Sequence, residues 1–101
     1  MAEKRKPTYD LDAFKAAFGS PEKLRATGAA LKGAAALGFG RVEMVAAIQT
    51  MQRSQFHKSM TAYADHRVWQ DVYHVQWDTT VLYVKFTTDA QGLIVISFKE
   101  K

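Results

Sequence analysis

The odd positions of two apolar segments near the end of the chain carry polar groups that could do chemistry: Tyr83, Lys85, Ser97 and Lys99. Successive side chains of a β-strand point to opposite faces of its sheet. If residues 81–87 and 93–99 are strands of one sheet, the four polar side chains can share one face. Such a face suits RNA, because ammonium groups neutralise phosphates and a tyrosine ring stacks on a base.

The even positions of the same segments are apolar and predict the buried face of the sheet. The residues expected in the core are Leu82, Val84, Phe86, Ile94, Ile96 and Phe98. A second interpretation of the polar face is a solvated surface on which lysines prevent edge-to-edge pairing with another sheet. The alternation by itself favours this second interpretation.

Several other chemistries are excluded or disfavoured. The chain has no cysteine, which excludes disulfides, thiolate zinc sites and thiol nucleophiles. The three histidines, at 57, 66 and 74, lack the spacing of a zinc site. The sequence Gly38-Phe39-Gly40 lacks the third glycine of a dinucleotide fingerprint and favours a turn between helices. We therefore expect neither a metal nor a cofactor.

Size and charge set the class of molecule. A chain of 101 residues with 48% hydrophobic and 24% charged residues predicts one folded domain, residues 1–101. The net charge of +4 favours a polyanionic partner. No apolar stretch approaches the roughly 20 residues needed to cross a bilayer, and no signal peptide follows the basic start. The expected location is the cytoplasm, with no membrane partner.

The hydrophobic period changes near Phe56. Before it, the spacing of apolar and capping residues predicts three helices and one short turn. The first helix runs from a cap at Asp10 or Asp12 to Gly19, and the turn starts at Ser20. The second helix runs from a cap at Thr27 through Leu37, and the third from about Arg41 to Met51. After it, alternation predicts strands at 56–61, 68–76, 81–87 and 93–99. Residues 1–7 are interpreted as a basic arm. The whole is an α+β domain with N-terminal helices packed on a largely antiparallel sheet.

One long block resembles a known family. Residues 56–73 are similar to the motility quorum-sensing regulator (MqsR) toxins, and the shared elements are Lys58-Ser59-Met60-Thr61, Tyr63, Asp65-His66 and Trp69-Gln70-Asp71-Val72-Tyr73. Two further stretches carry the resemblance: Val81 to Lys85 and the tail from Leu93 to Lys101.

The resemblance implies a type II toxin with the RelE-like fold that cleaves free mRNA, preferring sites within GCU, and needs no metal. It also implies a cognate antitoxin of the MqsA type, with a zinc-binding N-terminal domain and a helix-turn-helix domain that binds the promoter. The family's proposed active-site residues fall on Lys58, Gln70, Tyr83 and Lys99 of this chain.

Metal-free RNA cleavage needs a base for the 2′-OH, cations for the phosphate charge and an acid for the leaving oxygen. A lysine base would need its pKa lowered by burial or by neighbouring cations, which a cluster of Lys58, Lys85 and Lys99 could supply. Base and acid stay unassigned, and Gln70 is suited to orienting a phosphate or a base. Tyr63 and Arg67 are candidates for holding nucleotides, together with Lys85 and Ser97, whereas Trp69 is expected in the core.

Two other functions stay open at this point. A basic α+β module could use the same face to bind RNA or DNA without cutting it. A protein-interaction module could instead dock a partner along a sheet edge. Specific RNA cleavage that survives EDTA would distinguish a metal-free ribonuclease from both alternatives.

Overall fold

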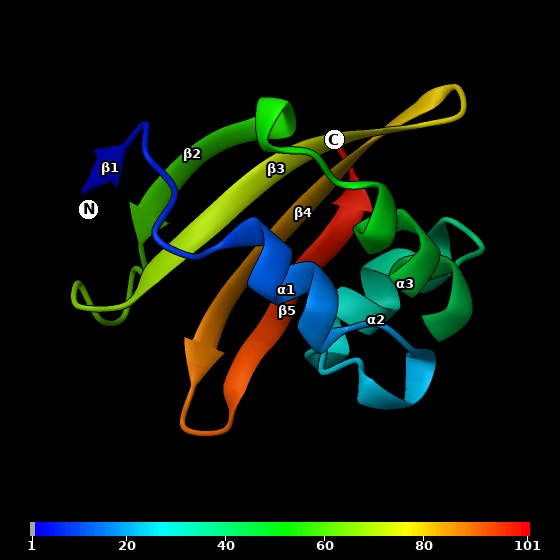
Figure 1. Cartoon of the computed structure of the whole chain (residues 1–101), viewed down its shortest axis with the longest axis horizontal. Helices are drawn as coiled ribbons and strands as arrows, with labels where there is room; N and C mark the ends of the chain where they lie inside the picture. The colour runs from blue at the N-terminus through cyan, green and yellow to red at the C-terminus, as the bar shows by residue number, and fades with distance from the viewer. Residues whose placement is uncertain (1) are drawn as a thin grey trace.

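Helices come first along the chain and the sheet last, as the change of period predicts. The computed structural model describes residues 2–101 (Figure 1). The helices are α1 (Leu11–Ala17), α2 (Gly28–Ala36) and α3 (Arg41–Thr50), with short 3₁₀ turns at Pro21–Lys23 and Arg53–Gln55. The strands are β1 (Glu3–Lys4), β2 (Phe56–Thr61), β3 (Trp69–Trp77), β4 (Thr80–Asp89) and β5 (Gly92–Glu100). The predicted α+β fold is confirmed.

The sheet has the order β1-β2-β3-β4-β5, and every neighbouring pair is antiparallel. The four long strands match the predicted segments to within two residues at their ends. The segment predicted as a basic arm contains a strand that was not predicted, because Glu3–Lys4 pairs with Met60 and Ser59 of β2. A strand of two residues has no alternation long enough to detect, and only its pairing with β2 defines it.

Capping side chains begin the helices where the sequence indicates. Asp10, rather than Asp12, caps α1, and its carboxylate accepts the backbone N–H groups of Asp12 at 2.8 Å and Ala13 at 3.3 Å. The Thr27 hydroxyl accepts the N–H of Ala30 at 3.2 Å at the start of α2. These contacts satisfy backbone donors that have no partner within the helix.

The core lies between the helices and the near face of the sheet in Figure 1. The Phe14 ring of α1 stacks on Phe86 of β4 with centroids 3.7 Å apart. The predicted apolar side of α3 is buried, and Met44 and Ile48 are fully inaccessible. Tyr73 and Val75 of β3 complete this layer from the sheet.

The predicted core row of β5 is wrong at two positions. Leu82, Val84, Phe86 and Phe98 are buried as expected, whereas Ile94 and Ile96 stay partly exposed and Val95 is buried in their place. A β-bulge is the cause: Lys85 pairs with Ser97 but Phe86 pairs with Val95, so Ile96 is an extra residue. One extra residue inverts the alternation on one side of the bulge.

A buried carboxylate fastens the N-terminal segment to the sheet. Asp71 of β3 is inaccessible to solvent and accepts the backbone N–H groups of Thr8, at 3.0 and 3.1 Å, and Tyr9, at 2.9 Å. The Thr8 hydroxyl in turn lies 2.8 Å from that of the buried Ser59. These bonds compensate the desolvation of the carboxylate.

Segments before and within α2 cover the outer edge of β5. Residues 25–27 pair with Val95 in a parallel bridge, with Val95 N–H donating to the Arg25 carbonyl at 2.9 Å and Thr27 N–H to the Val95 carbonyl at 3.0 Å. At Gly33 the helix approaches β5 so closely that a Cβ atom would lie 2.4 Å from the Phe98 carbonyl oxygen. An exposed sheet edge is thereby protected from pairing with other chains.

We predict that Gly33→Ala destabilises the protein although alanine is the better helix former. The new methyl group has to push α2 away from β5, and overpacking of this kind costs about 1–3 kcal/mol. Gly28→Ala in the same helix is the matched control, because nothing lies within 4 Å of its Cβ position. Urea unfolding measures both variants, and equal free energies of unfolding would contradict the expectation.

Candidate active site

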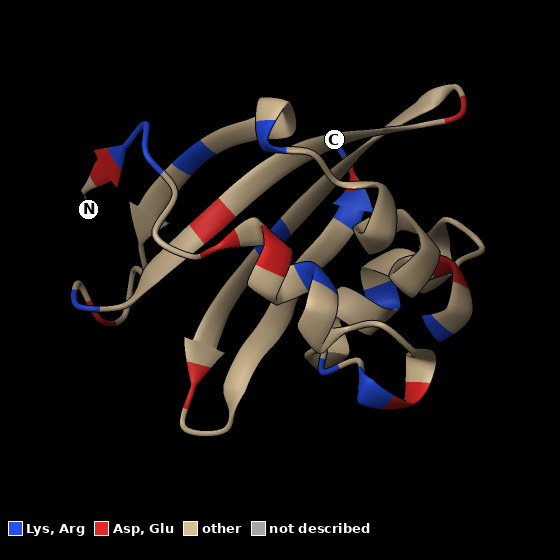
Figure 2. Ribbon diagram, in the orientation of Figure 1, with Lys and Arg blue, Asp and Glu red and all other residues tan. Residues whose placement is uncertain are grey.

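The face of the sheet turned away from α1 carries the predicted functional residues in rows that run across the strands. In the first row Lys58 of β2 pairs with Val72 of β3, Val72 with Lys85 of β4, and Lys85 with Ser97 of β5. Partners in an antiparallel pair share a face. Figure 2 shows basic residues on β2, β4 and the end of β5.

A second row lies directly beside the first, two residues along each strand. His74 of β3 pairs with Tyr83 of β4, and Tyr83 pairs with Lys99 of β5. The Lys99 ammonium lies 5.2 Å from the centroid of the Tyr83 ring. The prediction that Tyr83 and Lys99 share a face is confirmed, although Ile96 is not in the core, because the bulge precedes Ser97 and leaves the last residues of β5 in register.

Gln70 lies on the same face of β3, beyond Val72 on the side opposite His74, and pairs with Met60. The order along the strands is therefore Gln70, then the Lys58–Lys85–Ser97 row, then the Tyr83–Lys99 row. Rows two residues apart are separated by about 7 Å along a strand. The structure thus places Tyr83 and Lys99 side by side, with Lys85 one row away on β4. Lys58 lies two strands from Tyr83, on β2, and Gln70 lies at the far end of the face.

A bulge in β2 brings His57 to this face, which the alternation along the strand does not predict. Phe56 pairs with Tyr73 and Lys58 with Val72, which leaves His57 as the extra residue beside Lys58. The His57 ring stacks on His74, with centroids 4.2 Å apart and an angle of 22° between the planes. Two consecutive residues of β2 therefore face the same side, which simple alternation does not allow.

The cations on this face influence one another. Burial lowers the pKa of the Lys85 ammonium, and the charges of Lys99 and Lys58 lower it further. Lys58 is also engaged by Glu3 of β1 in an ion pair of 3.1 Å. The direction expected for a lysine in this cluster is therefore seen at Lys85.

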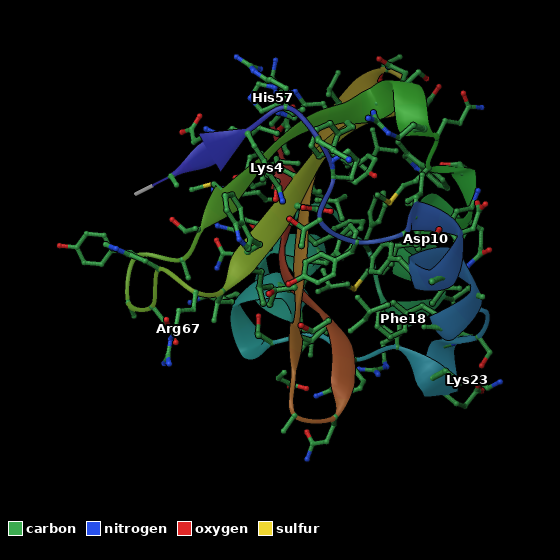
Figure 3. The ribbon with its side chains drawn as sticks, turned by 60° about the vertical axis from the view of Figure 1, so that its left-hand side comes forward. Lys4, Asp10, Phe18, Lys23, His57 and Arg67 are labelled. Atoms are coloured by element: carbon green, nitrogen blue, oxygen red, sulfur yellow. The ribbon has the colours of Figure 1, made fainter. Side chains whose placement is uncertain are left out.

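Two predicted nucleotide contacts, Tyr63 and Arg67, belong to the loop between β2 and β3, at the Gln70 end of the face. Figure 3 shows Arg67 and His57 at opposite ends of these strands. Tyr63 is 88% exposed, and Arg67 forms an ion pair with Asp65 at 3.1 Å.

The prediction that Trp69 lies in the core is wrong. Its side chain is half-buried, and the Lys4 ammonium lies 4.2 Å from its ring centroid.

A separate concave region lies near α1, on the helix side of the sheet. This cleft of about 510 Å³ is lined by Tyr73, Lys15, Arg53, Asp10 and Asp12, among other residues. Within residues 2–101 the Tyr73 hydroxyl has no hydrogen-bond partner, and burial raises its pKa to about 12. Acids and bases line the cleft in similar numbers, so it lacks the cationic character of the opposite face.

The part of the chain that the structure describes holds no group of three or more histidine, aspartate or glutamate side chains close enough to bind a metal ion. A search of the same residues for a helix long and apolar enough to span a membrane finds none.

The chain is similar to known proteins over nearly its full length. Residues 6–100 match the family model described as motility quorum-sensing regulator, toxin of MqsA. The chain is 38% identical over 99 residues to the mRNA interferase toxin MqsR of Escherichia coli strain K12, an alignment that covers 98% of this chain and 99% of the relative.

The chain belongs to the MqsR toxin family. The resemblance seen in the sequence is confirmed, and it extends over the helices as well as the strands. Lys58, Gln70, Tyr83 and Lys99, as well as the two histidines of the stacked pair, lie within the matched range of residues 6–100.

We predict that Lys85→Met stabilises the folded protein at pH 7. The lowered pKa means that the unfolded chain binds the Lys85 proton more tightly than the folded chain, so the charged amine opposes folding. The gain should shrink as pH rises from the lowered pKa toward the ordinary value of 10.5, where the amine is neutral in both states. Thermal unfolding at pH 7 and pH 10 measures this, and Lys23→Met, at an exposed position, is the control. A gain that does not depend on pH would contradict the electrostatic cause.

Proposed function

We propose that the chain is an endoribonuclease that cleaves mRNA without a metal ion and so inhibits translation and growth. The observation that carries the proposal is the pair of adjacent rows on the sheet, in which Lys58, Lys85, Tyr83 and Lys99 face one side together. The relative named an mRNA interferase toxin, similar over nearly the full chain, supports the same activity.

The proposed reaction is an attack by the ribose 2′-OH on the adjacent phosphorus. The 2′-oxygen forms a bond to phosphorus and the bond to the 5′-oxygen breaks, which gives a 2′,3′-cyclic phosphate and a 5′-OH. The 2′-OH loses its proton to a base and the leaving 5′-oxygen gains one from an acid. Negative charge grows on the phosphate oxygens in the transition state, and preorganised cations stabilise it.

The residues divide into those at the phosphate and those around it. Lys58 and Lys85 lie in one row and Lys99 in the next, and the three supply the cationic contacts. The Tyr83 hydroxyl on β4 and the Lys99 ammonium beside it on β5 are the proposed proton donors. Gln70, one row away, orients the substrate, because an amide donates and accepts hydrogen bonds without changing its charge.

Residues outside the two catalytic rows are proposed to hold the flanking nucleotides. Ser97 lies beside Lys85 at the β5 end of its row, and Tyr63 and Arg67 extend the surface beyond Gln70. An exposed tyrosine and a guanidinium offer flat surfaces on which unpaired bases stack. A preference for GCU sites follows from the family resemblance and is part of the proposal.

The test is incubation of the purified chain with a defined RNA that contains one GCU, with and without EDTA, followed by analysis of the product ends. Cleavage that persists in EDTA and gives a cyclic phosphate supports the proposal. RNA that is retarded in a gel but stays intact would favour the non-catalytic binding regulator instead. RNA that is neither bound nor cut would contradict both.

We predict that Lys99→Ala lowers the cleavage rate by about 10²–10⁴-fold, the range typical for loss of a general acid or base. Tyr83→Phe keeps the ring and removes only the hydroxyl. If the hydroxyl donates a proton or binds phosphate, this variant is nearly as slow as Tyr83→Ala; if only stacking matters, it is nearly as fast as the wild type.

Both side chains lie outside the core, so the variants should keep the wild-type circular dichroism spectrum. The matched control is Lys23→Ala, an exposed lysine of the 3₁₀ turn at Pro21–Lys23, far from the two rows. Full activity in folded Lys99→Ala and Tyr83→Ala proteins would place the reaction elsewhere.

We also propose a cognate antitoxin of the MqsA type, with a zinc-binding N-terminal domain and a helix-turn-helix domain. The family description, toxin of MqsA, supports this partner. We predict that expression of the chain alone stops growth and that co-expression with such an antitoxin restores it. Metal analysis should find zinc with the complex in proportion to the antitoxin. Stoichiometric zinc on the isolated chain, or unaffected growth with active protein, would contradict the expectation.

A further inference from the structure

The stacked pair of His57 and His74 has no role in the reaction outlined above, yet it lies in the same row as its central residues. His74 pairs with Tyr83, and Tyr83 pairs with Lys99. The His74 and Tyr83 rings are 6.0 Å apart between centroids. Both histidines are partly exposed on the catalytic face, so a bound RNA can reach them.

We propose that His74 is the general base that takes the 2′-OH proton, and that His57 positions its ring by stacking. The inference rests on the proposed ribonuclease function and names the base that the function leaves unassigned. His57 is a positioning residue, because it acts through His74.

The chemistry of the face supports histidine by comparison with its neighbours. Lysine and tyrosine have reference pKa values near 10 and ordinarily keep their protons at neutral pH, which makes them donors. Glutamine does not exchange a proton in this range. A neutral imidazole has one ring nitrogen with a free lone pair, and its reference pKa of about 6.5 leaves it mostly neutral at pH 7.

The surroundings of the pair act in the direction that a base requires. Burial lowers the pKa of His74 most, followed by the charges of His57, Lys101 and Lys58. Burial also lowers the pKa of His57, with Lys58, Arg5 and Lys101 adding to the effect and Glu3 opposing it.

Stacking at 4.2 Å has the same consequence as these charges. Two imidazolium ions in contact would repel each other, so the stacked arrangement is most stable when at least one ring is neutral.

The row also separates the two proton transfers in space. Neighbouring strands are about 4.8 Å apart, so β3 and β5 lie roughly 10 Å from each other on either side of Tyr83. His74 on one side accepts the 2′-OH proton as the bond from the 2′-oxygen to phosphorus forms. The Tyr83 hydroxyl, between these two strands, or the Lys99 ammonium, on β5, gives a proton to the 5′-oxygen as its bond to phosphorus breaks. Proton exchange with water then restores both groups.

The wild-type protein provides the first test, through its single-turnover cleavage rate between pH 5 and pH 9. We expect the rate to rise with a single ionisation below pH 6.5 and to be level from pH 7 upward. A rate that continues to climb toward pH 9 would assign the base to a lysine, with Lys85 the first candidate because its pKa is lowered, and would overturn the proposal.

Variants give the second test. His74→Gln keeps the polarity and size of the side chain but cannot accept a proton at these pH values, so we expect a loss of about 10²–10⁴-fold at pH 7 and no ionisation below pH 6.5. His57→Ala should reduce the rate by less, and His57→Phe should recover most of that loss because it restores the stack. The matched control is His66→Gln, an exposed histidine in the loop between β2 and β3.

An RNA with sulfur in place of the scissile 5′-oxygen separates base from acid. A thiolate leaves without protonation more readily than an alkoxide, since thiols have pKa values near 8.5. We expect His74→Gln to stay slow on this substrate, while the acid variant among Lys99→Ala and Tyr83→Phe recovers. Recovery of His74→Gln, or its full activity on ordinary RNA, would overturn the proposal while wild-type cleavage still supported the ribonuclease function. Absence of wild-type cleavage would instead defeat the function itself.

Discussion

The antiparallel pairing of β2, β3, β4 and β5 is the constraint on which the rest of the molecule depends. One face of this sheet has to be apolar to bury Phe14, Met44 and Ile48 of the helices, so the other face is free to carry charge. A slip of one residue in the register of β4 would turn Tyr83 and Lys85 into the core and expose Leu82 and Val84. Burial of the helix-facing side therefore fixes which side chains meet on the opposite side.

The charged face is held together against its own repulsion. Lys58, Lys85 and Lys99 lie in adjacent rows, and like charges at this distance oppose folding. Glu3 offsets part of this repulsion through its ion pair with Lys58, and the buried Val72 separates Lys58 from Lys85 in their row. A face of this kind attracts phosphate groups because bound phosphate removes the repulsion.

The two bulges differ in their consequences. In β5 the extra residue is Ile96, and because of it Val95 is buried in the core instead of Ile94 and Ile96. Ser97 and Lys99 stay in register with β4. In β2 the extra residue, His57, brings a second ring to the face beside Lys58 and within stacking distance of His74. A bulge thus changes which residues of a strand share a face. Bulges near active sites often redirect a side chain in this way.

The sequence by itself determined the three helices, the four long strands and part of the face. The cap at Thr27, the apolar side of α3 and the alternation around Tyr83 are signals within a few residues of one another, and local backbone geometry is sufficient to interpret them. For the first helix the sequence leaves Asp10 and Asp12 as alternatives, and the structure selects Asp10. The rest needed the tertiary structure: β1, the partly exposed Ile94 and Ile96, and the contact of His57 with His74. A bulge, a two-residue strand and a cross-strand stack exist only relative to a pairing partner that is distant in the chain, and no local period encodes that partner.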